Sequence, residues 1–143
     1  LHKKEEFTKK MFLNFKIIEE KCKQTLKQYD VRYNKIQDFA YSLSGGNLQK
    51  LIIAREMYSQ PELLIAAQPT RGVDIGATEF IHRQLIKQRD LGCAVLLISY
   101  DLSEIMSLSD RILVIYKGTI VGEISQAEAT EEKIGLLMSG IAS

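Results

Sequence analysis

The sequence has few of the residues that build metal sites and disulfide frameworks. Its 143 residues include two cysteines, Cys22 and Cys93, which lie far apart and form no C-x-x-C pair. This usage is simplest to interpret as that of a reduced, cytosolic chain in which both thiols are buried and inert. The two histidines, His2 and His82, are isolated, so no cluster has the spacing of metal ligands and we expect no metal site.

Long hydrophobic runs and a strong net charge are also missing. The longest apolar stretches are about as long as a β-strand, which excludes a membrane-spanning helix. The net charge is +1, so no overall field attracts nucleic acid or a membrane, although residues 1–35 hold ten Lys and Arg against five Asp and Glu. The chain begins at Leu1 without an initiator Met or a signal-peptide pattern, and we expect a piece of a longer polypeptide.

The first part of the chain has a helical pattern. Apolar side chains recur every three or four residues from Phe7 to Leu26, which predicts an amphipathic helix over residues 5–29. We expect the Phe and Met side chains at 7–15 to belong to the core. A connector follows, and a second helical pattern runs from Leu48 until Pro61 ends it.

Three short apolar runs then alternate with helices. The runs at 63–67, 94–99 and 111–116 predict buried strands, and between them we expect a helix over about 77–90 and a short one capped by Asp101. Lys117-Gly118 predicts a hairpin turn into a strand at 119–124, and a last helix runs from near Thr130 to about Met138. The order predicts an α/β fold with parallel strands and a C-terminal antiparallel hairpin.

The stretch YSLSGGNLQK at 41–50 is the most informative for function. A Ser-Gly-Gly-Asn turn precedes a helix, and a helix start offers unpaired N–H groups and the positive end of the dipole, both suited to an anion. The glycines remove side chains that would keep a phosphate away, and Ser44 adds a hydroxyl. The same pattern is equally typical of an ordinary loop with an N-cap.

The succession of LSGGN, a helix, a strand and QPTRGVD resembles the signature region of ABC-type ATPases. Together with AVLLISYDLSEIMSLSDRILVIYKGTIVGE, it is similar to the second nucleotide-binding domain of tandem ATPase subunits of sugar and nucleoside importers. The sequence has no GxxxxGK[ST] phosphate loop, so the resemblance implies a partial P-loop NTPase core. It implies that residues 1–40 are a segment of the helical subdomain and connector, and that residues 41–143 are the C-terminal half of the ATPase core.

The resemblance gives roles in ATP binding to six residues. In the family, the signature contacts the γ-phosphate of an ATP that the partner domain holds, and the D-loop crosses the same interface. The signature helix and the D-loop of this chain would supply Ser44, Gly45, Gly46, Asn47, Gln49 and Asp74.

Three positions depart from the family pattern. Ala67 stands where the Walker B Asp would bind Mg²⁺, Gln68 where the catalytic Glu would polarise water, and Tyr100 where the switch His would contact the γ-phosphate. Ala67 offers no oxygen ligand, and Gln68 cannot act as a general base. We therefore expect no catalytic residue and no hydrolysis in this chain, which by itself would hold neither ATP nor Mg²⁺.

The resemblance implies an energy-coupling subunit of an importer for sugars or nucleosides. The assembled transporter would use ATP and Mg²⁺ at the cytoplasmic face of the membrane. Its partners would be a companion nucleotide-binding domain, a membrane permease and, indirectly, a substrate-binding protein, with no nucleic acid. Because residues 1–35 are basic, a soluble ABC-type ATPase that acts on nucleic acid or ribosomes is the alternative. A third interpretation is a chain that folds but has no activity by itself.

Overall fold

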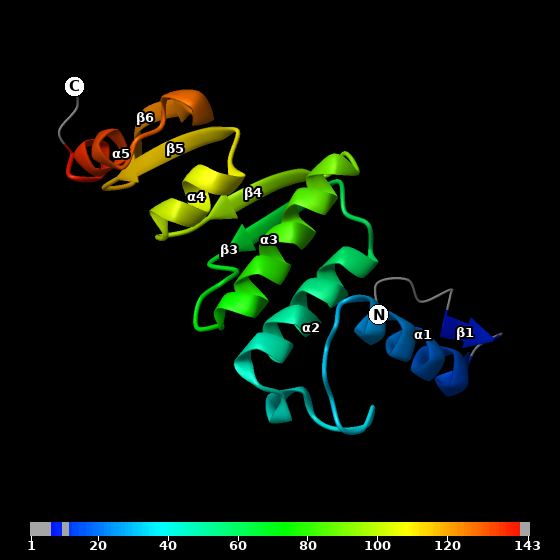
Figure 1. The fold of residues 1–143 in the computed structure, drawn as a ribbon. Helices are drawn as coiled ribbons and strands as arrows, with labels where there is room; N and C mark the ends of the chain where they lie inside the picture. The colour runs from blue at the N-terminus through cyan, green and yellow to red at the C-terminus, as the bar shows by residue number, and fades with distance from the viewer. Residues whose placement is uncertain (1–6, 10–11, 141–143) are drawn as a thin grey trace. The chain divides into compact units, whose positions relative to one another are not determined.

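The computed structural model describes residues 7–9 and 12–140. Contacts divide the chain into two compact units, which are described separately. Figure 1 labels the helices and strands. Unit 1 comprises Leu1–Leu64 and Pro69–Val95, and unit 2 comprises Ile65–Gln68 and Leu96–Ser143. The boundary at residue 40 was expected from the subdomains of ABC-type ATPases, and it stays a prediction.

Unit 1 begins with a short antiparallel pair and not with the expected long helix. Strand β1 (Thr8–Lys9) pairs with β2 (Phe12–Leu13), so the helix expected over residues 5–29 is wrong for these four positions. Residues 5, 6, 10 and 11 lie outside the described residues. Helix α1 (Phe15–Gln28) begins later because Asn14 is its N-cap, with the side-chain oxygen accepting a hydrogen bond from the Ile17 N–H at 3.2 Å.

The aromatic residues before and within α1 do not form one core stripe. Phe7 is buried and stacks on Tyr58 at 6.2 Å between ring centroids, as the core expectation requires. Phe12 and Phe15 are 79% and 74% exposed, which makes that expectation wrong for both, and Met11 lies outside the described residues. The physical reason is that α1 begins only at Phe15. Phe7 and Phe12 therefore lie outside the helix and do not share a helical face with Phe15.

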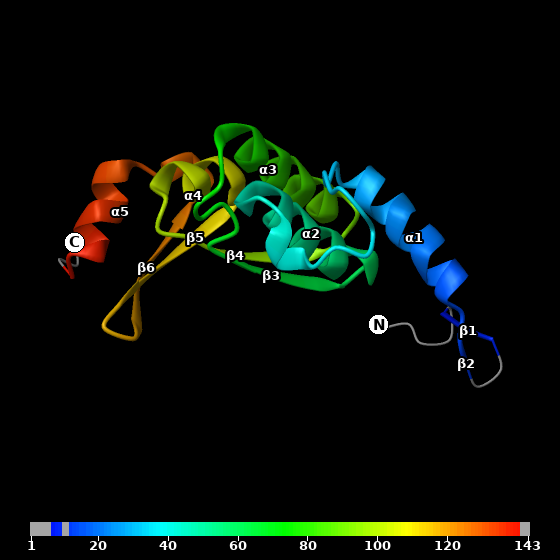
Figure 2. The ribbon, with the colours of Figure 1, turned by 90° about the horizontal axis from the view of Figure 1, so that it is seen from below.

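The core of unit 1 lies where helices α2 (Gly45–Tyr58) and α3 (Ile75–Asp90) pack side by side (Figures 1 and 2). Met57 of α2 is buried, as are Ile81 and Leu85 of α3, with Ile81 fully inaccessible. Helix α1 has no buried residue among its described positions. Its Cys22 is therefore exposed, contrary to the expectation of two buried thiols, whereas Cys93 is buried as expected.

Strands β3 (Leu63–Ala67) and β4 (Ala94–Ile98) form a parallel pair. In unit 1 the Ala94 N–H donates to the Glu62 carbonyl at 2.8 Å, and in unit 2 the Gln68 N–H donates to the Ile98 carbonyl at 2.8 Å. Both partners advance along the chain together, which is the parallel arrangement predicted from the sequence. Side chains alternate along each strand, so every second one is exposed.

Unit 2 is built on the predicted hairpin of β5 (Arg111–Tyr116) and β6 (Thr119–Ser125). Lys117 and Gly118 both have positive φ, 47° and 79°, as a two-residue hairpin turn requires. One face of the hairpin packs against α4 (Leu102–Leu108) and α5 (Glu131–Met138). The buried residues of this core are Ile112, Val114 and Ile124 of the hairpin and Ile134 of α5.

Caps set the starts of both helices of unit 2. The Asp101 carboxylate accepts hydrogen bonds from the Ser103 and Glu104 N–H groups, which confirms the predicted start of α4. Thr130 caps α5 by accepting from the Lys133 N–H at 3.2 Å. Two short 3₁₀ turns, η2 (Ala40–Ser42) in unit 1 and η3 (Gln126–Glu128) in unit 2, complete the described elements.

Candidate functional site

The signature residues form the first turn of α2. The helix begins at Gly45, three residues before the predicted start at Leu48, so the glycine pair belongs to the helix itself. Ser44 is the N-cap in extended conformation, and its side chain makes no capping hydrogen bond. Its hydroxyl instead accepts a hydrogen bond from the Asn47 amide at 2.9 Å. The hydroxyl of Ser44 therefore leaves the N–H groups of the first turn to other acceptors.

Both glycines of this turn allow a close approach to the segment around α3. A Cβ on Gly46 would lie 3.2 Å from the Ala77 Cβ and 3.3 Å from a carboxylate oxygen of Asp74. A Cβ on Gly45 would lie 3.4 Å from the Gly72 carbonyl oxygen. The absence of a side chain at Gly46 thus serves helix packing, a role that the sequence pattern did not reveal.

Asp74 is the N-cap of α3. One of its carboxylate oxygens accepts a hydrogen bond from the Ala77 N–H at 2.8 Å, while the other lies beside Gly46. Just before it, Gly72 has a φ of +74°, which gives the turn its direction. The structure therefore places Asp74 beside the signature turn and engages its carboxylate in a hydrogen bond at the start of α3. The role of Asp74 in ATP binding stays a prediction.

Asn47 and Gln49 are engaged within unit 1. The Asn47 amide donates to Ser44, and its oxygen accepts from the backbone N–H of Arg32 at 2.8 Å. The Gln49 amide donates to the Pro69 carbonyl at 2.9 Å. Both side chains thus link α2 to neighbouring segments in this structure.

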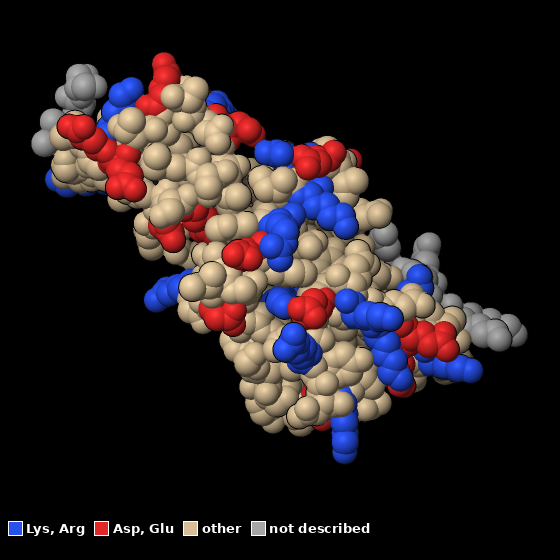
Figure 3. All heavy atoms as spheres, viewed as in Figure 1, with Lys and Arg blue, Asp and Glu red and all other residues tan. Residues whose placement is uncertain are grey.

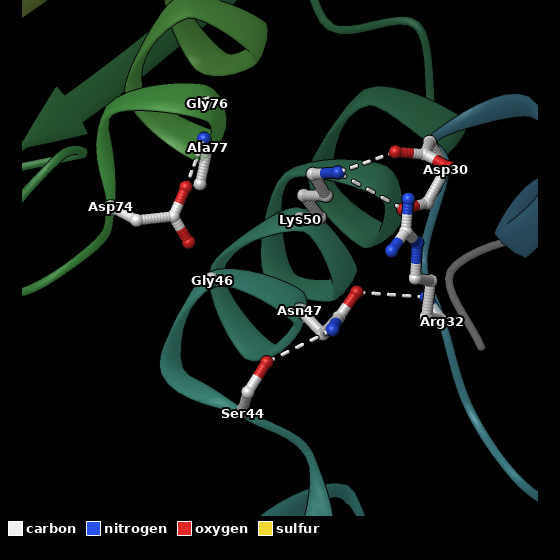
Figure 4. A pocket seen from close by; sticks show the side chains of 9 residues that line it. All are labelled: Asp30, Arg32, Ser44, Gly46, Asn47, Lys50, Asp74, Gly76 and Ala77. Atoms are coloured by element: carbon white, nitrogen blue, oxygen red, sulfur yellow. Dashed lines mark hydrogen bonds and ion pairs between the residues drawn. The ribbon is translucent and has the colours of Figure 1, made fainter.

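A pocket of about 290 Å³ lies in front of these residues (Figure 4). The start of α2 borders it on one side and the start of α3 on another. Two cations, Arg32 and Lys50, and two carboxylates, Asp30 and Asp74, contribute to its wall. The full lining is Asp30, Arg32, Ser44, Gly46, Asn47, Lys50, Asp74, Gly76 and Ala77.

Lys50 and Asp30 form an ion pair in the wall of this pocket. The Lys50 ammonium lies 2.7 Å from a carboxylate oxygen of Asp30 (Figure 4). The hydrogen bond and the positive charge of Lys50 lower the pKa of the Asp30 carboxyl below its ordinary value. The two residues are 20 positions apart, so the sequence gave no signal for this pair.

The three departing positions lie in unit 2, at the carboxyl ends of β3 and β4. Ala67 is the last residue of β3, Gln68 follows it with a φ of +50°, and Tyr100 is 83% exposed. The Gln68 amide nitrogen is buried and has no hydrogen-bond partner among residues 7–9 and 12–140. None of these side chains offers a carboxylate, so this edge does not fit a hard cation such as Mg²⁺. Across the same residues, no group of three or more His, Cys, Asp and Glu side chains could hold a metal ion.

Solved structures with a similar backbone are ATP-binding cassettes. The post-hydrolysis dimer of the cassette MJ0796 bound to ADP and Pi matches with a TM-score of 0.66 and 25% identity, over 75% of this chain and 46% of that chain. The ATP-binding subunit of an ABC transporter matches with a TM-score of 0.70 at 17% identity, over 85% and 55% of the two chains, which shows the fold. The fold is thus that of an ABC ATPase.

Curated relatives carry the comparison further. The guanosine import ATP-binding protein NupO of Bacillus subtilis is 55% identical over 120 residues, which are 84% of this chain and 24% of that protein. The nucleoside import ATP-binding protein NupA of Lactococcus lactis is 49% identical over 129 residues, 90% of this chain and 26% of that protein. No family model matches. The chain belongs to the family of ABC import ATP-binding proteins, and it spans about a quarter of the length of these relatives.

The close packing at Gly46 predicts a cost for any side chain there. Gly46→Ala should displace Asp74 and weaken its bond to the Ala77 N–H, lowering the free energy of unfolding by about 1 kcal/mol. Gly135→Ala is the matched control, because a Cβ at that helical position of α5 meets no atom within 4 Å. It should raise the free energy by about 0.5–1 kcal/mol. Urea unfolding followed by circular dichroism measures both, and a stable Gly46→Ala variant would contradict the packing argument.

The Asp30–Lys50 pair predicts part of the acid sensitivity. Because the Asp30 pKa is lower in the folded chain than in the unfolded one, the pair stabilises the fold above the unfolded pKa of about 3.9. This stabilisation is lost as the pH falls through the folded pKa. Because solvent reaches the Asp30 side chain, Asp30→Asn should lower the urea midpoint only slightly at pH 6 and leave it unchanged at pH 2. An equal loss at both values would exclude the ion pair as the cause.

Proposed function

We propose that this chain is part of the ATP-binding subunit of an importer for nucleosides or sugars. Its role there is to present the first turn of α2 to an ATP molecule that a companion cassette holds. The observation that carries the proposal is the position of Ser44 and Gly46 at the pocket, with Gly46 directly against the D-loop residue Asp74. The names of the relatives, which are import proteins for guanosine, nucleosides and glucose, support the transport role.

The start of α2 has the chemistry to bind a phosphate group. The N–H groups of its first turn and the positive end of the helix dipole favour an anion, and the glycines let a phosphate oxygen come close to the backbone. Ser44 adds a hydroxyl at the same end of the helix. ATP would supply the γ-phosphate that bridges the two cassettes, and this chain contributes the helix end that receives it.

The edge of β3 and β4 supports a division of labour between two sites. Ala67 and Gln68 replace a metal ligand and a general base with an inert methyl group and an amide. We infer that hydrolysis takes place at the companion's site, where Mg²⁺ would also be held. The six signature and D-loop residues, Asn47, Gln49 and Asp74 among them, serve that neighbouring site.

The expected partners follow from this role. They are a companion nucleotide-binding domain, a membrane permease and, through the permease, a substrate-binding protein, at the cytoplasmic face of the membrane. Within residues 7–9 and 12–140, no helix has the length and apolarity needed to cross a bilayer. On the face drawn in Figure 3, Lys and Arg side chains of the described residues lie among carboxylates.

The first test is ATP-dependent association. The companion cassette carries a Glu-to-Gln change that blocks hydrolysis, and it is sedimented with this chain in the presence and absence of ATP. Ser44→Phe should abolish the ATP-dependent complex, because the ring fills the space in front of the first turn of α2. Glu132→Phe, which adds the same ring at an exposed position of α5, should leave it intact. The proposal would be overturned if the complex formed equally well without ATP, or if Ser44→Phe did not prevent its formation.

The second test concerns the missing acids. Restoring the family residues with the double change Ala67→Asp and Gln68→Glu should alter ATP turnover of the intact import subunit by less than about twofold, because the neighbouring site does the chemistry. Steady-state ATPase measurement on the reconstituted transporter gives the number. A large gain in turnover would show that the strand edge of this chain is itself a hydrolytic site.

A further inference from the structure

Lys50 is not an ordinary solvated lysine. It lies on α2 one turn beyond Gly46, and only 13% of its side chain is exposed. Its ammonium donates to the backbone carbonyl of Asp30 at 3.1 Å and to the carboxylate of the same residue at 2.7 Å. It also lies 4.8 Å from the centre of the Phe80 ring, on α3. One cation therefore joins α2 to the segment after α1 and to α3.

The segment that Lys50 binds has a fixed backbone. Asp30 has a φ of +49° and follows the end of α1, where the Asp30 N–H donates to Lys27 and the Val31 N–H donates to Leu26. These two bonds form the Schellman motif, which orients the peptide groups at a helix end. Because Lys50 binds the carbonyl as well as the carboxylate of Asp30, it holds the main chain at the end of α1.

A second contact on the same side of α2 acts on the same segment. Asn47, three residues before Lys50, accepts a hydrogen bond from the Arg32 backbone N–H and donates one to the Ser44 hydroxyl (Figure 4). Side chains three residues apart lie on one face of a helix. The connector at residues 30–32 is thus bound to α2 at two points, through Lys50 and through Asn47. The Asn47 side chain also bonds to Ser44, the N-cap of the signature helix.

We propose that Lys50 is a positioning residue for the signature: it fastens the connector after α1 to α2, so that Ser44 and the first turn of α2 keep the orientation in which they receive a phosphate. This inference rests on the proposed function of the signature. Lys50 touches neither ATP nor the reacting atoms in this role. It acts through the connector, through Asn47 and through α3.

An ion pair with only a structural role would give a different experimental result. The Asp30 side chain is 59% exposed, and pairs that solvent reaches contribute little to the free energy of unfolding. The positioning role predicts instead a change in the ATP concentration needed for association, with the amount of complex at saturating ATP preserved. If Lys50 positions the signature, replacing it by another cation should preserve ATP-dependent association. Removing a charge from α1, away from Lys50, should not affect that association.

The experiment titrates ATP in the sedimentation assay with the hydrolysis-blocked companion cassette. Lys50→Met should raise the half-saturating ATP concentration by about 3- to 10-fold, with the same amount of complex at saturation. Lys50→Arg should recover most of the loss. Asp30→Asn should have a smaller effect, because the carbonyl contact remains and Asn tolerates a positive φ. Lys23→Met, which removes an exposed ion pair with Glu19 inside α1, is the matched control and should shift nothing.

The possible results distinguish a failure of the positioning role of Lys50 from a failure of the proposed function of the signature. If Ser44→Phe abolishes the complex while Lys50→Met and Asp30→Asn titrate like the unmodified chain, the positioning role is wrong and the proposed function stands. If Ser44→Phe has no effect, both are wrong. Circular dichroism checks that each variant is folded, and Asp30→Asn decides the matter if Lys50→Met unfolds. Effects of Lys50→Met and Asp30→Asn that simply add in the double variant would also overturn the coupling.

Discussion

The contact between the first turns of α2 and α3 is the constraint on which the candidate site depends. It exists because Gly46 has no side chain, which lets Asp74 and Ala77 come within van der Waals distance of the signature helix. The same two helices share the buried core of unit 1, with Met57, Ile81 and their neighbours. Core packing and site geometry are therefore one arrangement, and a change in either affects the other.

The two units differ in the chemistry they offer. Unit 1 presents a helix start with glycines and a hydroxyl, both suited to holding a phosphate. Unit 2 presents a strand edge where Ala67, Gln68 and Tyr100 provide no charge for a metal ion. Gln68 adopts a positive φ of 50° there, at the end of β3. If a cassette only contributes its signature to a partner's ATP site, it needs the helix start of unit 1 but not acidic residues at the strand edge of unit 2.

Much of the fold followed from local patterns. The strands at 63–67 and 111–116, the Lys117-Gly118 turn and the cap at Asp101 were predicted because each is encoded in a few adjacent residues. The start of α1 was missed because periodicity continues through residues 7–14, while the cap at Asn14 and the β1–β2 pair decide the backbone.

The sequence pointed to the helix start at the candidate site, but it gave no signal for Asp30 and Arg32 at the pocket or for the contacts between the lining residues. Ser44, Gly45 and Gly46 were identifiable from the motif, since a helix start with glycines has a known chemistry. The bonds from Lys50 to Asp30 and from Asn47 to Arg32 join residues 20 and 15 positions apart, and no local rule specifies such pairs. The packing role of Gly46 likewise depends on where α3 lies, which only the three-dimensional fold determines.

The unequal exposure of the two thiols has a practical consequence. The sequence contains two cysteines, and of these Cys22 is exposed on α1 while Cys93 is buried. A maleimide dye would therefore react with these 143 residues at Cys22 on α1, while the buried Cys93 is shielded. A fluorophore at this position reports on the orientation of α1, the helix whose end Lys50 binds, and so makes movements of the connector visible in solution.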